Sequence, residues 1–312
     1  MQEFNHYTVM KNEAVDALNC QNGLIYVDAT LGGGGHSELI LQRIQPDGRL
    51  ISFDIDDDAI NYSSEKLKDY KNLTIVKDSY TNIKKVLQDL NIKKITGGIL
   101  FDLGASYHQL TKQERGFSFT KDAPLDMRFN KDADFSARDV VNEYSEADLV
   151  RIFSEYGEEH FSKRIAKAIV AKRHVKSIDT TLELAQIVKD ATPPVKSRIH
   201  PATRVFQAIR IEVNNELNVL KKALEDVINS LNINGRVCVI TFHSLEDRIV
   251  KNLFKKYSVV EGNRINDFRK AKDIEEANFI EVNKKVIVPS EEEIINNPRS
   301  KSAKLRILKR VR

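Results

Sequence analysis

Four consecutive glycines at residues 32–35 are the feature that most constrains the fold of this 312-residue chain. An apolar run of strand length precedes them, and sequence typical of a helix follows from His36. Glycines between a strand and a helix let the backbone approach a ligand closely, and the N–H groups that begin the helix point toward it. The stretch therefore predicts either a binding loop for a nucleotide-like molecule or a tight turn that binds nothing.

The spacing of these glycines narrows the class of ligand. It is not the G-x-G-x-x-G of dinucleotide-binding enzymes, and no Lys-Ser or Lys-Thr pair follows to complete a phosphate-binding P-loop. A nicotinamide oxidoreductase is therefore disfavoured. A cofactor without phosphates fits the loop better, and we expect S-adenosylmethionine.

Polar residues follow the next apolar runs of strand length. Asp54, Tyr80 and Asp102 each lie at or just beyond the end of such a run. The carboxyl ends of parallel strands meet at one edge of a sheet, so we expect these side chains beside the glycine loop. Asp54 is expected to bind ribose hydroxyls, although it could instead cap the helix that follows.

The order of the predicted elements indicates an α/β fold with an insertion. Strands and helices alternate up to Asp102, the pattern is helical over residues 111–205, and strand-like sequence returns at 235–242 after a long helix over 202–231. We expect a Rossmann-like, mostly parallel sheet formed by residues 1–110 and 206–312. An all-helical domain for substrate recognition is then inserted at residues 111–205.

The composition is that of a soluble globular protein. Hydrophobic residues make up 41% of the chain, the net charge is +4, and no apolar run approaches the length of a membrane span. The N-terminus lacks the pattern of a signal peptide, so we expect a cytoplasmic protein without a membrane partner. Cys20 and Cys238 lie in apolar contexts without metal-ligand spacing, which predicts free thiols and no metal site.

The C-terminal segment is strongly basic. Residues 297–312 contain no acidic residue, and their basic residues are Arg299, Lys301, Lys304, Arg306, Lys309, Arg310 and Arg312. The alternation at 304–307 predicts a strand with one basic face. That face would suit a phosphate backbone, or its charge would protect an exposed sheet edge; the sequence supports both interpretations equally.

Several long motifs together resemble the RsmH (MraW) family of bacterial 16S rRNA cytidine methyltransferases, and the resemblance spans nearly the whole chain. It is carried by residues 28–37, 102–104, 115–119, 124–128, 200–204, 242–248 and 297–299. The resemblance implies a class I S-adenosylmethionine-dependent methyltransferase fold with a helical insertion. The implied reaction is methyl transfer to the exocyclic 4-amino group of a cytidine in the decoding region of 16S rRNA in the small ribosomal subunit.

The resemblance also implies a set of cofactor contacts. Carried over by position, they are Gly34, Gly35, His36, Asp54, Tyr80, Asp102 and Gln109. Tyr80 stands where the family often has Phe, and either ring can stack on adenine. Residues 105–109 depart from the usual Val-Ser-Ser-Pro-Gln and introduce His108, which is expected to pack or to accept a proton after transfer.

Asp102 and His243 are the candidate catalytic residues. The cytosine amine is a poor nucleophile because its lone pair is delocalised, so an enzyme must orient that pair and accept the N–H groups. Asp102 is expected near the transferred methyl group, or it binds the cofactor alone. His243 ends the fifth strand and is expected on the substrate side.

The helix after the fifth strand is expected to begin with a capping box. Ser244 and Asp247 have the spacing of that motif, which gives Ser244 a structural role. Asp247 is expected either to form an ion pair with Arg248 or to contact RNA.

Substrate contacts are expected on the inserted domain. Phe117 and Phe119 lie among charged residues, and we favour packing over base stacking for both rings. For Asp126 and Arg128, the sequence supports a contact with the substrate and a purely structural role equally. Arg204, on the polar face of the long helix, is a further candidate contact.

Two other functions compete with this interpretation. Amino methylation of DNA would require an Asn/Asp-Pro-Pro-aromatic motif after the fourth strand, whereas Asp102 is followed here by Leu, Gly and Ala. An RNA-binding assembly factor with a vestigial cofactor cleft would not need Asp54 and Asp102, and both are present. Only a test of cofactor turnover separates this last alternative from an enzyme.

Overall fold

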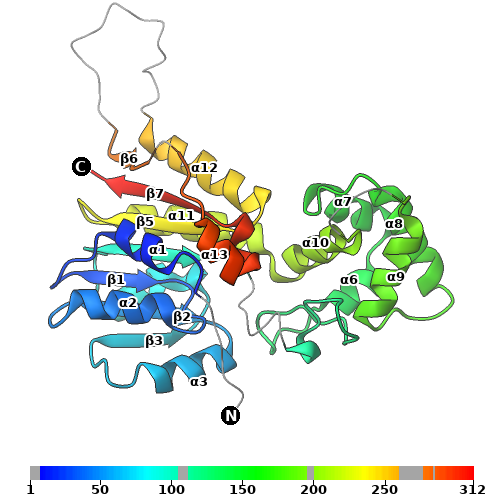
Figure 1. Cartoon of the computed structure of the whole chain (residues 1–312), viewed down its shortest axis with the longest axis horizontal. Coiled ribbons are helices and arrows are strands. Elements are labelled where there is room, and N and C mark those ends of the chain that lie inside the picture. The colour runs from blue at the N-terminus through cyan, green and yellow to red at the C-terminus, as the bar shows by residue number, and fades with distance from the viewer. Residues whose placement is uncertain (1–7, 105–111, 195–199, 260–276, 284) are drawn as a thin grey trace, which may run out of the picture. The chain divides into compact units, whose positions relative to one another are not determined.

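A computed structural model describes residues 8–104, 112–194, 200–259, 277–283 and 285–312 (Figure 1). The chain divides into two compact units. The first unit comprises Met1–Gly104 and Leu217–Arg312, and the second comprises Ala105–Glu216. Within the described ranges, every helix is too short or too polar to cross a bilayer.

The first unit is built on a seven-stranded sheet in the order β3-β2-β1-β4-β5-β7-β6. Its strands are β1 (Ile25–Asp28), β2 (Arg49–Asp54), β3 (Leu73–Lys77), β4 (Gly98–Asp102), β5 (Arg236–Thr241), β6 (Phe279–Glu281) and β7 (Lys304–Arg310). The first five pair in parallel, whereas β7 runs antiparallel to β5 and β6. The mostly parallel sheet confirms the expected fold class. Because β1 pairs with both β2 and β4, the strand order reverses there, which is where such sheets bind ligands.

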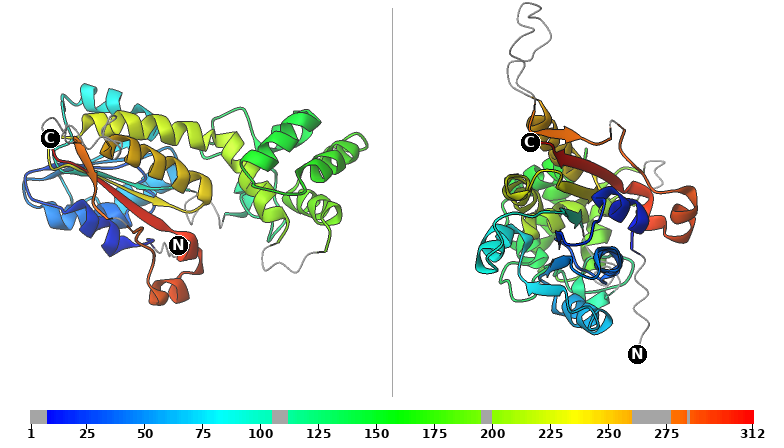
Figure 2. Two further views of the ribbon diagram at one scale, coloured as in Figure 1. Left: turned by 90° about the horizontal axis from the view of Figure 1, so that it is seen from above. Right: turned by 90° about the vertical axis from the view of Figure 1, so that its left-hand side faces the viewer.

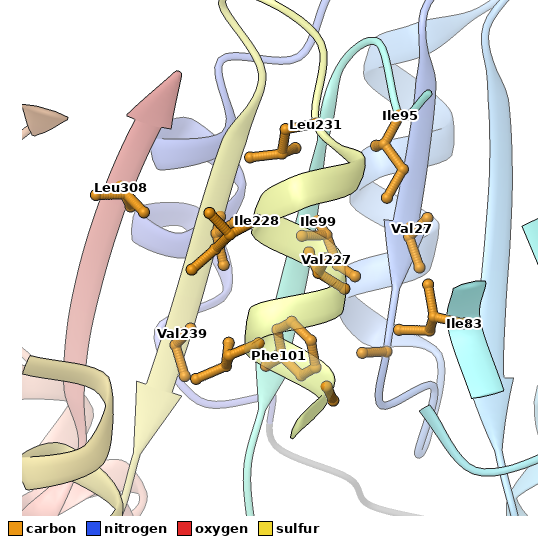
Figure 3. Close-up of a cluster of buried hydrophobic side chains, with 14 of the residues drawn as sticks. Val27, Ile83, Ile95, Ile99, Phe101, Val227, Ile228, Leu231, Val239 and Leu308 are labelled. Atoms are coloured by element: carbon orange, nitrogen blue, oxygen red, sulfur yellow. The ribbon is translucent and has the colours of Figure 1, made fainter. Parts of the chain in front are cut away.

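Helices cover both faces of this sheet (Figure 2). The helices of this unit are α1 (Lys11–Leu18), α2 (Gly35–Ile44), α3 (Asp57–Lys66), α4 (Ile83–Asp89), α11 (Glu216–Ser230), α12 (Ser244–Ser258) and α13 (Glu291–Asn296). Successive strand residues point to opposite faces, so neighbours in β1 enter different cores. Val27 belongs to a buried cluster that includes residues of α4 and α11 (Figure 3), whereas Tyr26 belongs to one that includes residues of α1 and α2. Burial on both faces explains why the strands read as nearly continuous apolar runs.

The second unit has its own hydrophobic core, and its α-helices begin at Ala137. The helical pattern expected from residue 111 is wrong for the described residues 112–136, where the only helix is the 3₁₀ helix Gln113–Arg115. The α-helices of this unit are α6 (Ala137–Glu143), α7 (Glu146–Glu155), α8 (Ser162–Arg173), α9 (Thr181–Ala191) and α10 (Ala202–Asn214). Two of these helices begin with side-chain caps. The Ser145 hydroxyl accepts the N–H of Asp148 at 3.1 Å, and Thr180 and Glu183 form a reciprocal capping box.

The prediction of one long helix over residues 202–231 is wrong. Asn215 adopts a left-handed φ of 49°, which ends α10 and allows α11 to begin at Glu216. Asparagine tolerates this conformation better than most residues, and good helix formers on both sides hide the break in the sequence. Before the break, α10 packs on α6, α7 and α9 within the second unit.

Candidate active site

The glycine loop joins β1 to α2, and its conformation requires glycine. Gly32 and Gly34 have φ values of 47° and 70°, which residues with a Cβ rarely adopt. A Cβ on Gly35 would lie 1.9 Å from the Thr8 Oγ1 atom. Thr8 thus occupies the space beside Gly35, and α2 starts directly at this glycine. The loop is held tightly from the protein side, with the first N–H groups of α2 at its end.

Asp54 ends β2 and fixes the glycine loop from the neighbouring strand. Its Oδ2 atom accepts the N–H of Gly32 at 2.8 Å, and its Oδ1 atom accepts the N–H groups of Ile55 and Asp56 at 2.8 and 3.0 Å. Burial raises the pKa of this carboxyl, while these three hydrogen bonds oppose the rise. The helix-capping alternative for Asp54 is wrong, because Asp56 caps α3 by accepting the N–H of Asp58.

Asp28, which no sequence argument singled out, is the most buried acid of the loop. Its carboxylate accepts the Ser37 hydroxyl at 2.6 Å and the Thr30 N–H at 3.1 Å. The Ser37 and Ser52 hydroxyls lie 2.8 Å apart. Burial raises the pKa of Asp28 to about 6, because these hydrogen bonds compensate the loss of water only in part. Its signals in the sequence are its place at the end of an otherwise apolar strand and at the start of the motif at residues 28–37.

Asp102 ends β4 next to this group, and His36 lies beside it. The His36 Nδ1 and Asp102 Oδ2 atoms are 3.7 Å apart, and the Asp102 N–H donates to the Thr30 hydroxyl at 2.7 Å. Among the described residues, the buried Oδ1 atom of Asp102 has no hydrogen-bond partner. Burial, and then the nearby charge of Asp28, raise the pKa of Asp102 well above its ordinary value. A buried carboxylate oxygen without a donor indicates a position where a ligand supplies one.

Tyr80 follows β3 and begins a 3₁₀ helix, Tyr80–Asn82. Its half-buried ring meets Phe101 of β4 edge to face, with centroids 5.6 Å apart. The expected aromatic residue beyond β3 is therefore positioned by packing on the strand that ends in Asp102. Gln109 and His108 lie outside the described residues.

His243 follows β5 and occupies the N-cap position of α12. Its Nε2 atom lies 3.1 Å from the Glu246 Oε1 atom, and Glu246 Oε2 accepts the N–H groups of Phe242 and His243 at 2.8 and 3.3 Å. The predicted capping pair of Ser244 and Asp247 is therefore wrong by one residue. The helix starts one residue earlier than the Ser-x-x-Asp pattern suggested, and Glu246 takes the role expected of Asp247.

Asp247 instead holds the basic face of β7. Its carboxylate accepts the Arg306 guanidinium at 2.7 and 3.2 Å and lies 3.3 Å from Lys304 Nζ. The expected pair of Asp247 with Arg248 is thus replaced by contacts to β7. The edge-strand interpretation of residues 304–307 is also wrong, since β7 is paired on both sides. Two of the basic residues near the C-terminus, Lys304 and Arg306, therefore form ion pairs within the fold.

This ion pair predicts a specific pH dependence of stability. Burial alone would raise the pKa of Asp247, but the hydrogen bonds and charges of Arg306 and Lys304 outweigh burial and lower it. A lowered folded pKa contributes stability above the unfolded value of about 4, and that stability is lost as the pH falls through the folded value. Asp247→Asn should lower the free energy of unfolding at pH 7 by about 2 kcal/mol.

Urea unfolding at pH 7 and pH 3 measures this effect. The difference between wild type and Asp247→Asn should shrink at pH 3, where the wild-type carboxylate is also being protonated. Glu291→Gln removes an exposed carboxylate and serves as the control, with no expected change. Equal differences at both pH values would contradict the assignment of this ion pair.

In the second unit, Asp126 and Arg128 bind each other. The Arg128 Nε and Nη2 atoms donate to the two carboxylate oxygens of Asp126 at 3.0 and 2.6 Å, and Arg128 Nη1 donates to the Ala133 carbonyl. Each side chain is about a quarter exposed. Arg204 is separate from this pair: it is exposed and donates to the Glu158 carbonyl at 3.1 Å. The three candidate substrate residues thus all have structural contacts.

The aromatic residues of the second unit pack as expected. Phe117 stacks on Phe129 with centroids 5.5 Å apart. Phe119 lies between His200 and Phe206, with centroid distances of 4.9 and 4.8 Å. These rings contribute to the helical core and its rim, which confirms packing for both phenylalanines.

Comparison with known proteins identifies the family. The model of the MraW methylase family matches residues 3–311. Two proteins named ribosomal RNA small subunit methyltransferase H, from Clostridium botulinum strains Loch Maree and Kyoto, are 49% and 48% identical over 310 residues. These matches cover 99% of this chain and 100% of each relative. Among solved structures, an rRNA methylase from Streptococcus thermophilus has a TM-score of 0.44 at 11% identity, covering 96% of this chain and 95% of that one. With a family match over nearly its whole length and relatives close to half identical, the chain belongs to the MraW methylase family.

Proposed function

We propose that this protein transfers the methyl group of S-adenosylmethionine to the exocyclic 4-amino group of a cytidine in the decoding region of 16S rRNA. The family match and the names of the full-length relatives support an S-adenosylmethionine-dependent rRNA methyltransferase of the small ribosomal subunit. An enzyme with this substrate acts in the cytoplasm. The observation that carries the proposal is the cluster of glycines, acids and His36 at the ends of β1, β2 and β4, around an unpartnered oxygen of Asp102.

The residues at these strand ends fit the cofactor. The proposed contacts remain Gly34, Gly35, His36, Asp54, Tyr80, Asp102 and Gln109. Both Asp54 oxygens accept backbone N–H groups, and each retains acceptor capacity for a ribose hydroxyl. The Tyr80 ring packs edge to face on Phe101 of β4, and it is the proposed stacking partner of adenine. S-adenosylmethionine supplies an electrophilic methyl group when bound.

The role proposed for Asp102 is that of an acceptor near the reacting amine. Its pKa is raised by burial, and its Oδ1 atom has no donor among the described residues. A donor that arrives with a ligand would stabilise this oxygen strongly, because few other groups or waters compete for it. The same oxygen could serve the cofactor alone, and kinetic measurements at saturating cofactor distinguish the two roles.

The role proposed for His243 is to face the substrate. Its Nε2 atom lies 3.1 Å from the Glu246 Oε1 atom without a hydrogen bond between them, and the backbone hydrogen bonds of Glu246 keep that carboxylate in place. Among the described residues, both buried ring nitrogens of His243 have no hydrogen-bond partner, and the residue directly follows the end of β5, the strand next to β4. It is therefore suited to accept a hydrogen bond or a proton from a bound base.

The second unit is proposed to recognise the rRNA. Asp126, Arg128 and Arg204 stay candidate contacts, because each retains exposed atoms beside its structural hydrogen bonds. The second unit also has solvent-facing Lys163, Arg164, Lys167 and Lys172 on α8, which carries no acidic residue. Positive charge on one helix favours a phosphate backbone.

A labelled-methyl assay tests the proposed function. The protein is incubated with isotopically labelled S-adenosylmethionine and small ribosomal subunits from a strain that lacks the enzyme, and the rRNA nucleosides are identified by mass spectrometry. We expect the label in 4-methylcytidine. Label in another nucleoside would overturn the proposed substrate atom. Cofactor binding without any label would favour the non-catalytic assembly factor.

A further inference from the structure

The beginning of the described chain is clamped between the cofactor site and the C-terminal helix α13. Thr8 packs against Gly35, and the Val9 carbonyl lies 3.1 Å from the His36 Nε2 atom. The next residue, Met10, is fully buried and donates its N–H to the Glu293 Oε1 atom of α13 at 2.8 Å. Residues 8–10, called here the N-terminal strap, therefore connect α13 to the first turn of α2 (Figure 1).

The strap does not adopt this path by local preference. Met10 has a left-handed φ of 49° and precedes α1 without a side-chain cap. This conformation is unfavourable for a residue with a long side chain, so surrounding contacts must maintain it. Burial of the Met10 side chain and the hydrogen bond from its N–H to Glu293 are such contacts.

Glu293 has the sequence spacing of a capping-box residue, but its carboxylate binds the N–H of a distant residue. Ser290 caps α13 by accepting the Glu293 N–H at 3.1 Å, which gives the Ser-x-x-Glu spacing of a capping box. In such a box the glutamate carboxylate accepts the N–H of the cap residue, as the Glu183 carboxylate accepts the Thr180 N–H at 3.2 Å. Glu293 instead reaches Met10, almost the whole length of the chain away, and becomes 93% buried. Burial raises its pKa, which the bond from Met10 only partly offsets.

The strap sets the protonation pattern of His36. A carbonyl oxygen can only accept, so the contact with Val9 requires a proton on the His36 Nε2 atom. The other ring nitrogen, Nδ1, then faces Asp102 with 3.7 Å between it and Oδ2, and it carries a proton only when the ring is charged. The strap contact is therefore one constraint on the tautomer and the ring orientation of His36, whose side chain is buried.

We propose that Glu293 is a positioning residue of the cofactor site, which acts through the N-terminal strap to hold His36 as the Nε2–H tautomer with Nδ1 toward Asp102. The inference depends on the proposed role of His36 and Asp102 in cofactor binding. Glu293 thereby gains a role in the cofactor site, although it is distant in sequence from the strand ends that form this site. Its essential feature is a hydrogen-bond acceptor at the Glu293 Oε1 position, and not the negative charge.

Two substitutions separate the acceptor from the charge. Glu293→Gln keeps an oxygen of the same reach but removes the charge, whereas Glu293→Asp keeps the charge but withdraws the oxygen from Met10. Glu292→Gln, on the exposed face of the same helix, is the matched control. Nitrogen-15 NMR of the full-length protein, with His36 assigned from a His36→Gln spectrum, reports the tautomer. Calorimetry with S-adenosylhomocysteine reports the affinity of the site.

We expect Glu293→Asp to lose the pure Nε2–H tautomer of His36 and to raise the Kd for S-adenosylhomocysteine about tenfold, which equals about 1.4 kcal/mol. Glu293→Gln and Glu292→Gln should keep both properties within about twofold of wild type. Unchanged tautomer and affinity in Glu293→Asp would overturn the proposal. Equal damage from Glu293→Gln would also overturn it, because charge would then be the essential property.

The experiment also separates this inference from the proposed function. If His36→Gln binds S-adenosylhomocysteine like wild type, His36 is not in the cofactor site, and the proposed site fails together with the inference. If His36→Gln weakens binding and Glu293→Asp does not, only the inference fails. Should Glu293→Asp not fold, the wild-type spectrum remains decisive, because an Nδ1–H tautomer of His36 contradicts the strap contact directly.

Discussion

Replacing Asp102 with alanine is expected to abolish methyl transfer, lowering kcat/KM for rRNA by about 1000-fold even at saturating S-adenosylmethionine. The physical reason is the buried Oδ1 atom, which has no partner among the described residues and is available to a donor on a bound ligand. Steady-state assays on small ribosomal subunits, with the S-adenosylmethionine concentration varied, measure the loss. A role in cofactor binding alone predicts that excess cofactor restores kcat.

Stability measurements show whether such a loss reflects unfolding. The pKa of Asp102 is raised in the folded protein, so its ionised form lowers stability above the unfolded pKa, and this cost persists at neutral pH. Asp102→Asn removes the charge with little change of shape and should raise the free energy of unfolding by about 0.5 to 2 kcal/mol. Unchanged turnover of Asp102→Ala would contradict the catalytic assignment, and a destabilised Asp102→Asn would contradict the electrostatic argument.

Replacing Asp54 with alanine is expected to weaken the binding of S-adenosylhomocysteine by about 100-fold. The substitution removes the proposed ribose acceptor and also the carboxylate that fixes the Gly32 N–H at 2.8 Å. The glycine loop, with its left-handed residues, would then lose one of its hydrogen bonds to β2 and keep that of the Leu31 N–H to the Phe53 carbonyl. Isothermal calorimetry measures the affinity, and circular dichroism establishes that the variant is folded.

Asp57→Ala is the matched control for this prediction. Asp57 is an exposed acid at the start of α3, and it pairs with Lys77 at the surface. Removing its charge should change the affinity by less than about threefold, since exposed ion pairs contribute little. Similar losses in both variants would mean that the general negative charge of this region matters, and not the specific hydrogen bonds of Asp54.

Much of the candidate site could be predicted because it follows from strand periodicity. Asp54 and Asp102 end strands in the sequence and in the structure, and parallel pairing of β2, β1 and β4 brings these ends to one edge. Glycines with positive φ were equally predictable, because only glycine adopts these angles readily. Asp28 was missed, since its burial depends on Ser37 and Ser52, which arrive from other elements.

Predictions about charged pairs were less successful. Asp247 was expected to pair with its neighbour Arg248 and instead binds Lys304 and Arg306 of β7. Glu246, not Asp247, is the acid of the α12 capping motif. Which partner a charged side chain selects depends on distances between elements, and a single sequence contains no information on those distances.

The sequence by itself determined the strands other than β6, the glycine loop, the helical character of residues 137–191 and the family, because these depend on local periodicity, backbone conformation and long motifs. The tertiary structure decided where the helix after residue 202 breaks, which acid caps α12, and which residues reach across the chain. Glu293 illustrates the difference: its Ser-x-x-Glu spacing predicts a local cap, yet its carboxylate binds the N–H of Met10. A local pattern specifies which hydrogen bonds a side chain can make, and only the packing of distant segments determines which of them it does make.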